Sequence, residues 1–196
     1  MSQHRDRALE PTTDEEMSVS HIGTPQLLNG HVTLVDYDPQ WPGMFEAEAA
    51  KIRAALADRA MLVEHAGSTS VPGLCAKPIL DIILAVPDST DEARYVPALE
   101  AAGYTLHIRE PGWFQHRLLK GADPAVNLHV FTTGCDEIHR MLLMRDWLRT
   151  HPEDRDLYAR TKRRLAARRW KYTQHYADAK STVVAEILAR AEAART

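Results

Sequence analysis

The stretch EHAGSTSVPGLCAKPILDIILAV, residues 64–86, decides how the chain is interpreted. It opens at the end of a short apolar run, residues 61–65, which predicts a buried strand. A turn follows over residues 67–70, where one glycine precedes three hydroxyl side chains. Residues 78–86 form the most apolar run of the chain and predict a central strand. A strand, a Gly-Ser turn and a second strand therefore form the centre of the predicted fold.

The segments on either side extend this sheet and cover it. Helical spacing of apolar residues predicts helices over residues 42–58 and 91–102. Further strands are predicted at residues 31–35, 104–109, 113–120 and 126–131. From residue 137 onward the apolar pattern is helical. We expect an α/β fold: a mixed β-sheet of about five strands flanked by helices, with a C-terminal helical layer.

Length and composition limit the class of protein. With 196 residues, 44% hydrophobic and 26% charged, the chain predicts one folded domain, residues 31–196. Residues 1–30 are polar and without period, and they predict a flexible N-terminal tail with no buried face. No apolar run reaches eighteen residues, so we expect no membrane-spanning helix. The two cysteines match no disulfide or zinc pattern, and the N-terminus lacks a secretory signal, so we expect a cytoplasmic protein.

The charge is unevenly distributed along the chain. Residues 137–196 hold 14 Lys and Arg against 8 Asp and Glu, whereas the whole chain has a net charge of −3. The basic C-terminal third favours an anionic ligand. Residues 160–172 alone carry seven cations interleaved with aromatic residues, and a basic helix over 160–171 is one candidate for binding nucleic acid. A solvated helix face explains the same run, and the negative net charge favours that interpretation.

Two features of residues 64–86 predict a ligand site. The backbone of Gly67 and the hydroxyls of Ser68, Thr69 and Ser70 are groups that bind phosphate oxygens, although a capped turn has the same composition. Asp81 places a carboxylate inside an apolar strand, which predicts a Mg²⁺ or phosphate-linked site. An ion pair with Lys77 or an arginine is the structural alternative.

Several other side chains are candidates for the same region. Lys77 and Arg117 are the cations expected to neutralise a bound phosphate, unless they form structural ion pairs. Three histidines lie on or beside predicted strands and are candidates for a general base or for metal ligands: His65, His116 and His129. Ordinary polar pairing with neighbours explains them equally. Tyr172 and Lys180 are expected to line the cleft from the helical layer.

Residues 64–82 resemble the signature of the GrpB family. Three further segments agree with it, DPQWP at 38–42, NLHV at 127–130 and RDWLRTHPE at 145–153, and the resemblance spans residues 32–192. It implies a fold similar to that of the nucleotidyltransferases, and a domain that also occurs fused to dephospho-CoA kinase. In nucleotidyltransferases a Gly-Ser turn binds nucleotide phosphate and two carboxylates, spaced Asp-x-Asp, hold two Mg²⁺.

The match to that chemistry is incomplete. Gly67, Ser68 and Asp81 correspond to the turn and to one carboxylate, but isoleucines stand two residues before and after Asp81. On the later strand the candidate is His129, and Mg²⁺ prefers oxygen ligands.

We expect a nucleotide or other phosphate-bearing small molecule in the Gly-Ser/Asp cleft, and transfer of a nucleotidyl group with Mg²⁺ if the protein is an enzyme. In that hypothesis Asp81, His65 and His129 are catalytic, Asp81 holds the metal, and Gly67, Ser68, Thr69, Ser70, Lys77 and Arg117 bind phosphate. Six of these residues should then converge on one cleft: His65, Ser68, Lys77, Asp81, Arg117 and His129. One alternative is an accessory module that binds a nucleotide, a CoA-like ligand or a protein. Another is a histidine-site ligase or cyclase that uses a different divalent metal.

Overall fold

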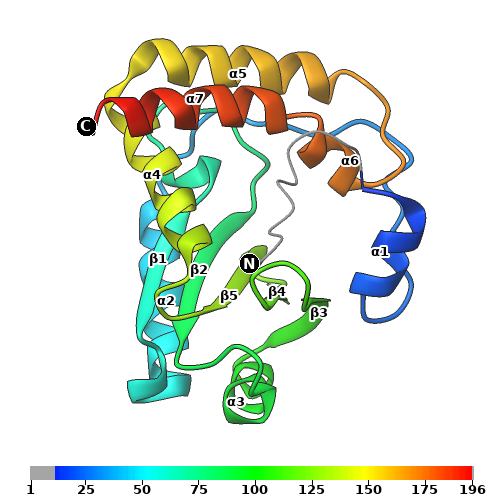
Figure 1. The fold of residues 1–196 in the computed structure, drawn as a ribbon, viewed down its shortest axis with the longest axis vertical. Coiled ribbons are helices and arrows are strands. Elements are labelled where there is room, and N and C mark those ends of the chain that lie inside the picture. The colour runs from blue at the N-terminus through cyan, green and yellow to red at the C-terminus, as the bar shows by residue number, and fades with distance from the viewer. Residues whose placement is uncertain (1–11, 196) are drawn as a thin grey trace.

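The computed structural model describes residues 12–195, which form a five-stranded mixed sheet covered by helices (Figure 1). The strand order is β1-β2-β5-β4-β3; β2 and β5 are parallel and the other neighbours are antiparallel. The strands are β1 Leu62–Ala66, β2 Leu80–Val86, β3 Tyr104–Glu110, β4 His116–Gly121 and β5 Val126–Thr132. The helices are α1 Asp14–Ser20, α2 Trp41–Leu56, α3 Val96–Ala101, α4 Asp136–Thr150, α5 Pro152–Ala166, α6 Thr173–Asp178 and α7 Ser181–Ala193. This architecture confirms the predicted α/β fold with a mixed sheet.

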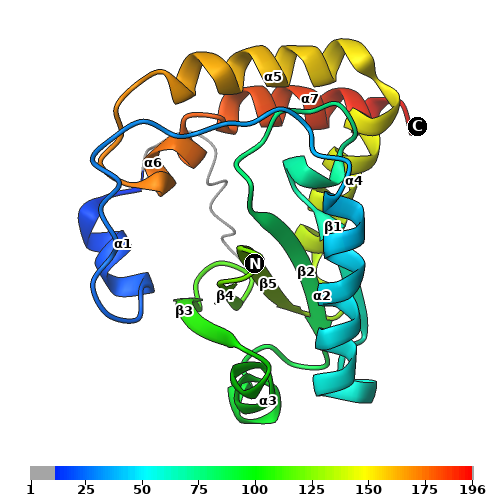
Figure 2. The same ribbon diagram turned by 180° about the vertical axis from the view of Figure 1, so that it is seen from behind.

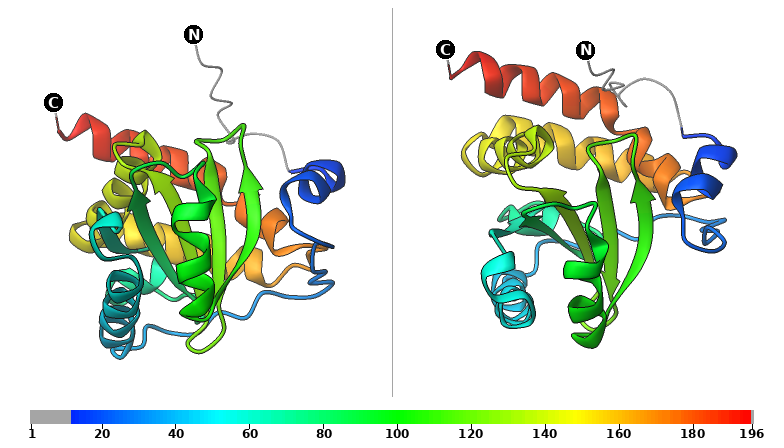
Figure 3. Two further views of the ribbon diagram at one scale, coloured as in Figure 1. Left: turned by 90° about the horizontal axis from the view of Figure 1, so that it is seen from below. Right: turned by 60° about the horizontal axis from the view of Figure 1, so that its bottom comes forward.

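Strand β2 is the centre of the core because both of its faces are covered. Leu80, Ile82 and Leu84 pack against residues of α2 and α3. Figure 3 shows these two helices on one face of the sheet. On the opposite face, Ile83 packs with Ile138 of α4. Side chains alternate along a strand, so Asp81 lies on the α4 face.

The C-terminal helical layer is also confirmed. Helices α5 and α7 lie side by side beyond one end of the sheet, and α4 connects the sheet to them (Figures 1 and 2). Leu148, Tyr158 and Ile187 form an apolar cluster with Val71 and Leu74, which follow the Gly-Ser turn. This packing holds the helical layer directly over the residues that connect β1 to β2.

Three predicted elements differ in the structure. Residues 31–35 form no strand; Gly30 and Val35 make single β-bridges to Trp170 and Ala76. The helix predicted over 91–102 is a 3₁₀ turn followed by α3. Strand β4 begins only at His116, because the two preceding residues have positive φ values of 52° that interrupt extended backbone.

The N-terminal segment also differs from the expected tail. Residues 1–11 lie outside the described residues, but residues 12–30 include α1, which begins with a capping box between Thr13 and Glu16. Met17 of α1 is only 4% exposed, and the amide of Ile22 donates to the carbonyl of His107 in β3. The prediction that this segment lacks a buried face is therefore wrong for residues 12–30. A short helix that buries only one residue, Met17, produced no detectable periodicity.

Replacing Met17 by alanine tests whether α1 stabilises the domain. We expect the free energy of unfolding to fall by about 2 kcal/mol, the low end for a buried Met-to-Ala change, because α1 is peripheral. Val19→Ala on the same helix is the control, since Val19 is 81% exposed. Urea denaturation of both variants measures the difference. Equal stability of the two variants would show that α1 contributes nothing to the fold.

Candidate functional site

The Gly-Ser turn lies directly against Asp81. Strands β1 and β2 pair with Ala66 opposite Asp81, so the turn that leaves β1 crosses over the carboxylate. Gly67 has φ 64° and ψ −166°, a conformation that only glycine adopts readily. A Cβ atom at Gly67 would overlap Oδ2 of Asp81 and lie 2.9 Å from its Cβ and Cγ. Glycine at this position therefore permits close contact between turn backbone and carboxylate.

Asp81 is held by two residues of β5. The parallel register places Asn127 opposite Asp81, and the Asn127 amide donates to Oδ1 at 2.9 Å. The Nε2 atom of His129 lies 3.6 Å from the same oxygen, so His129 and Asp81 share one face, as the alternation predicts. Burial opposes ionisation, but His129, Asn127 and Lys77 outweigh it and hold the pKa of Asp81 below its usual range. Asp81 is therefore a carboxylate at neutral pH.

His129 is in turn part of a hydrogen-bonded chain. Its Nδ1 atom lies 3.1 Å from Nε2 of His116, and Nδ1 of His116 lies 2.7 Å from a carboxylate oxygen of Glu110. The rings of His116 and His129 stack with their centroids 5.2 Å apart. These contacts fix the orientation of the His129 ring. Glu110 was not a sequence candidate, because its contact with His116 depends on the β3–β4 pairing.

Lys162 of α5 is a site residue that the sequence analysis missed. Its Nζ atom donates to the Ser68 hydroxyl at 2.8 Å and to the carbonyl oxygen of Cys75, and the residue is 2% exposed. Burial lowers the pKa of Lys162 to about 7. It was hidden inside the basic run, but it lies four residues after Tyr158 and three before Leu165, both of which are buried. This helical spacing was the available signal.

Two further lysines, Lys77 and Lys180, lie within electrostatic range of the Asp81 carboxylate. Burial lowers the pKa values of Lys77 and Lys180, and the charge of Asp81 opposes this effect in both. The Lys180 ammonium lies 4.7 Å from the ring centroid of Tyr176. Tyr176 is 1% exposed, and its hydroxyl has no hydrogen-bond partner among residues 12–195. The charge of Asp81 acts against the lowering of the pKa in Lys77, Lys162 and Lys180, so all three lysines lie within electrostatic range of one carboxylate, and Asp178 also acts on Lys180.

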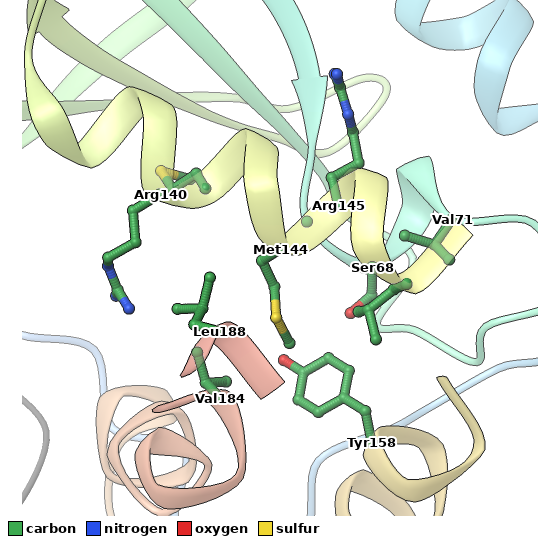
Figure 4. Close-up of a pocket in the computed structure, with 11 residues that line it drawn as sticks. Ser68, Val71, Arg140, Met144, Arg145, Tyr158, Val184 and Leu188 are labelled. Atoms are coloured by element: carbon green, nitrogen blue, oxygen red, sulfur yellow. The ribbon is translucent and has the colours of Figure 1, made fainter. Parts of the chain in front are cut away.

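An apolar cavity of about 140 Å³ opens beside Ser68 (Figure 4). Met144 of α4, Tyr158 of α5 and Leu188 of α7 line it, together with Gly67 and Ser68. In Figure 4 the side chains of Ser68 and Tyr158 face the same space. Burial, and then the charge of Asp81, raise the pKa of Tyr158 to about 12, so its hydroxyl remains a hydrogen-bond donor at neutral pH.

Two predicted phosphate ligands of the turn point elsewhere. Thr69 is 1% exposed, and its hydroxyl bonds to Nε2 of His65 at 3.0 Å. The Ser70 hydroxyl donates to the carbonyl oxygen of Gly67 at 2.6 Å. Both hydroxyls hold the turn together, so the prediction that they face the ligand is not supported. Only Gly67 and Ser68 of this turn line the cavity.

His65 and Arg117 lie on the other face of the sheet, contrary to the predicted convergence. His65 precedes Ala66, the partner of Asp81, so alternation directs it toward α2, where it stacks on Phe45 at 4.8 Å. Burial lowers the pKa of His65 to about 4, which keeps its ring neutral near pH 7. Arg117 precedes the residue that pairs with His129, and its Nε donates to Glu92 at 2.6 Å. Each of the two residues lies one position from the residue that pairs with Asp81 or His129, so strand alternation directs its side chain to the opposite face of the sheet.

Further observations concern the predicted metal site and the predicted nucleic-acid-binding helix. Residues 12–195 contain no group of three or more His, Cys, Asp or Glu side chains arranged to hold a metal ion. The basic segment 160–171 is not one helix, since α5 ends at Ala166. Trp170 and Tyr176, predicted to interleave with cations, pack against each other with ring centroids 6.2 Å apart. Within the described part, no helix is both long and apolar enough to cross a bilayer.

Comparison with known proteins settles the family. The profile of the family described as GrpB protein matches residues 31–190. The chain belongs to the GrpB family. A UPF0157 protein of Halalkalibacterium halodurans is 58% identical over 183 residues, covering 93% of this chain and 94% of that one. The crystal structure of the conserved protein GrpB from Enterococcus faecalis superposes with a TM-score of 0.72 at 30% identity, covering 81% of this chain and 96% of that one.

The chain is also similar, more weakly, to two larger proteins with other names. A dephospho-CoA kinase of Mycolicibacterium paratuberculosis is 29% identical over 169 residues, covering 72% of this chain and 42% of that protein. This match agrees with the expected occurrence of GrpB domains within dephospho-CoA kinases. The Cid1 poly(U) polymerase superposes with a TM-score of only 0.45 at 12% identity, which is too weak to support an assignment of activity.

Proposed function

We propose that this GrpB-family protein binds a nucleotide or a similar phosphate-bearing small molecule at the Asp81 site. The observation that supports this proposal is a group of desolvated lysines, Lys77, Lys162 and Lys180, within electrostatic range of Asp81, with the Lys162 ammonium hydrogen-bonded to Ser68 of the Gly-Ser turn. Desolvated ammonium groups are costly unless an anion compensates them. The hydroxyl of Tyr176, which has no hydrogen-bond partner among residues 12–195, is a further buried polar atom beside Lys180.

The chain's own residues suggest separate roles in binding. Lys162 and the Ser68 hydroxyl are already hydrogen-bonded to each other, and a phosphate oxygen would bind both. Lys77 and Lys180 would neutralise the remaining charge. The apolar cavity beside Met144 and Leu188 would receive an uncharged part of the ligand. Both cysteines are free, which is consistent with the proposed cytoplasmic location.

Mg²⁺ fits this site only as a single ion that shares its coordination with the ligand. Asp81 and the Ser68 hydroxyl supply oxygen donors, and Mg²⁺ is commonly held by one or two carboxylates plus substrate phosphates. Such an ion would neutralise phosphate charge. The residues do not fit a two-metal centre, because isoleucines occupy both positions two residues from Asp81 and His129 offers nitrogen.

Because no second carboxylate stands two residues from Asp81, a second candidate function, the accessory binding module, is favoured over nucleotidyl transfer. If the protein is an enzyme, His129 is the residue placed to accept a proton, because Asp81 and His116 fix its ring.

Thermal shift with Asp81→Asn tests the proposal. A panel of nucleoside triphosphates and CoA species is measured with and without Mg²⁺; a ligand at one hundred times its Kd adds about 2.7 kcal/mol. We expect wild type to be stabilised by at least one phosphate compound and the variant to lose its Mg²⁺-dependent part. The ligand-free variant should lose only about 1 kcal/mol, since the Asp81 side chain is 31% exposed.

Asp58→Asn is the control, because Asp58 is exposed and distant from the site in sequence and fold. A wild type that responds to no phosphate compound would contradict the proposal. A variant that unfolds without ligand, beside a metal-insensitive wild type, would instead show that Asp81 is a structural ion-pair partner.

A further inference from the structure

A second cavity, of about 320 Å³, adjoins the Gly-Ser turn at Ser70, and Arg145 lines both this cavity and the first. It opens where β1 ends, between the N-terminal part of α2 and the C-terminal part of α4. Glu46 and Phe45 line it from α2, and Arg145 and Arg149 line it from α4. Its volume is within the range of small-molecule sites. The Asp81 site and its proposed phosphate ligand leave this cavity unexplained.

Two arginines of α4 form one wall of the cavity, which we call the α4 wall. The guanidinium of Arg145 is held by several partners, whereas that of Arg149 is incompletely paired. Arg145 is fixed by Glu64 at 2.7 Å, by Asp146 at 2.7 Å and by the carbonyl oxygen of His65 at 2.9 Å. Arg149 lies one turn further along α4. Its Nε and Nη2 atoms donate to the carbonyl oxygen of Ser70 at 3.0 and 2.9 Å, which fixes the plane of the guanidinium.

The charge of Arg149 is poorly compensated. Its nearest carboxylate is Asp146, 3.5 Å from Nη1, and that carboxylate already binds Arg145. Burial, and then the positive charge of Arg145, lower the pKa of Arg149, although a guanidinium stays protonated. The side chain is 39% exposed and lines the cavity, and within residues 12–195 its Nη1 atom makes only the long contact to Asp146. A preoriented guanidinium with spare donor capacity is a receptor for a carboxylate.

The α2 wall has the opposite charge. Glu46 is exposed and forms no ion pair within residues 12–195. Glu64, whose side chain is 38% exposed, lies between the two walls on β1. A simple anion would bind Arg149 but meet Glu46, and also Glu64, which already pairs with Arg145. A molecule that carries an ammonium group beside its carboxylate would satisfy both walls.

The remaining surface of the cavity is aromatic and apolar. Phe45 stacks on His65 in an almost parallel arrangement, and Tyr37 packs edge-on against Trp41. These rings are held in place before any ligand binds. They offer an apolar side chain a rigid surface at little cost in conformational entropy.

We propose that this second cavity binds a free α-amino acid with an aromatic or aliphatic side chain. The ligand carboxylate binds Nη1 of Arg149, the ammonium group lies toward Glu46 and Glu64, and the side chain packs on Tyr37 and Phe45. This site is independent of the proposed phosphate site, so each stands or fails by its own ligand.

Isothermal titration with the common amino acids, and with N-acetyl and amide derivatives of those that bind, tests this assignment. We expect at least one apolar amino acid to bind, and both derivatives to bind at least tenfold more weakly, because each lacks one of the two charges. Succinate, which carries no ammonium group, should bind no better than the derivatives. Succinate binding as tightly as the amino acid, at a site that Arg149→Met removes, would overturn the proposal in favour of a plain anion site.

Two variants test the contributions of α4 and α2 to amino acid binding separately. Arg149→Met should weaken amino acid binding at least tenfold, and Arg160→Met, an exposed arginine of α5, should leave it unchanged. Because Arg149 also holds the Ser70 carbonyl, Glu46→Gln provides a variant of an exposed residue that keeps the fold. It should weaken binding of the amino acid but not of the corresponding carboxylic acid without its amino group. Absence of any amino acid binding at about 10 mM, or full affinity in both variants, would refute the proposal.

Discussion

Alanine at position 67 is expected to destabilise the protein strongly and to abolish ligand binding at the Asp81 site. The φ and ψ values of Gly67, 64° and −166°, alone cost a non-glycine residue about 1–3 kcal/mol. The added methyl group must also displace Asp81, because it would overlap Oδ2. We therefore expect a loss of about 3 kcal/mol or more in the free energy of unfolding, measured by urea denaturation.

The matched control is Gly134→Ala. Gly134 also has a positive φ, 78°, but a Cβ atom there meets nothing within 4 Å. This variant carries backbone strain without the steric overlap, so it should lose clearly less stability than Gly67→Ala. Similar losses in the two variants would mean that close contact between the turn and Asp81 contributes nothing beyond backbone strain.

The second large effect is a pH dependence of stability that comes from Lys162. Burial lowers the pKa of Lys162 to about 7 in the folded protein, against 10.5 for the reference lysine. Between these values the unfolded chain binds more protons than the folded one, so stability rises with pH from about 7 to about 10. At 1.36 kcal/mol per pKa unit, the rise attributable to Lys162 is about 2–4 kcal/mol.

Replacing Lys162 by methionine should flatten most of this rise. The lowered pKa values of Lys77 and Lys180 leave a smaller slope of the same sign, so the difference between wild type and variant is the informative quantity. Arg160→Met, at an exposed position on α5, is the control and should retain the wild-type slope. Urea denaturation at several pH values between 7 and 10 measures the slopes. Parallel slopes for wild type and Lys162→Met would contradict the role of Lys162.

Local patterns predicted the part of the site that lies on strands. The alternation of residues 78–86 placed Asp81 on one face of its strand, and the same rule placed His129 opposite its apolar neighbours in β5; the β2–β5 pairing then brings the two together. Gly67 was identified because a Gly-Ser turn between two strands is typical of a phosphate-binding loop. These inferences succeeded because strand periodicity and turn chemistry depend on residues within a few positions along the chain.

Long-range packing decided the residues that local patterns misplaced. Lys162 belongs to a run of exposed cations, and only the docking of α5 against residues 71–75 buries it beside Ser68. Arg117 has a suitable charge, but its position in β4 directs it to Glu92 on the opposite face. Both outcomes depend on which elements pair and in which register, and the sequence nearby does not encode that choice locally.

By itself, the sequence determined the family, the α/β class, the central position of β2 and the faces of Asp81 and His129 within their own strands. Only the tertiary structure decided that β2 pairs with β5 so that Asp81 and His129 share a face, and that three lysines from separate segments lie within electrostatic range of Asp81. It also decided that Thr69 and Ser70 close the turn and that Arg149 and Glu46 line one cavity. Periodicity is a property of neighbouring residues, whereas the charge balance of a site is set by side chains that folding brings together from distant parts of the chain.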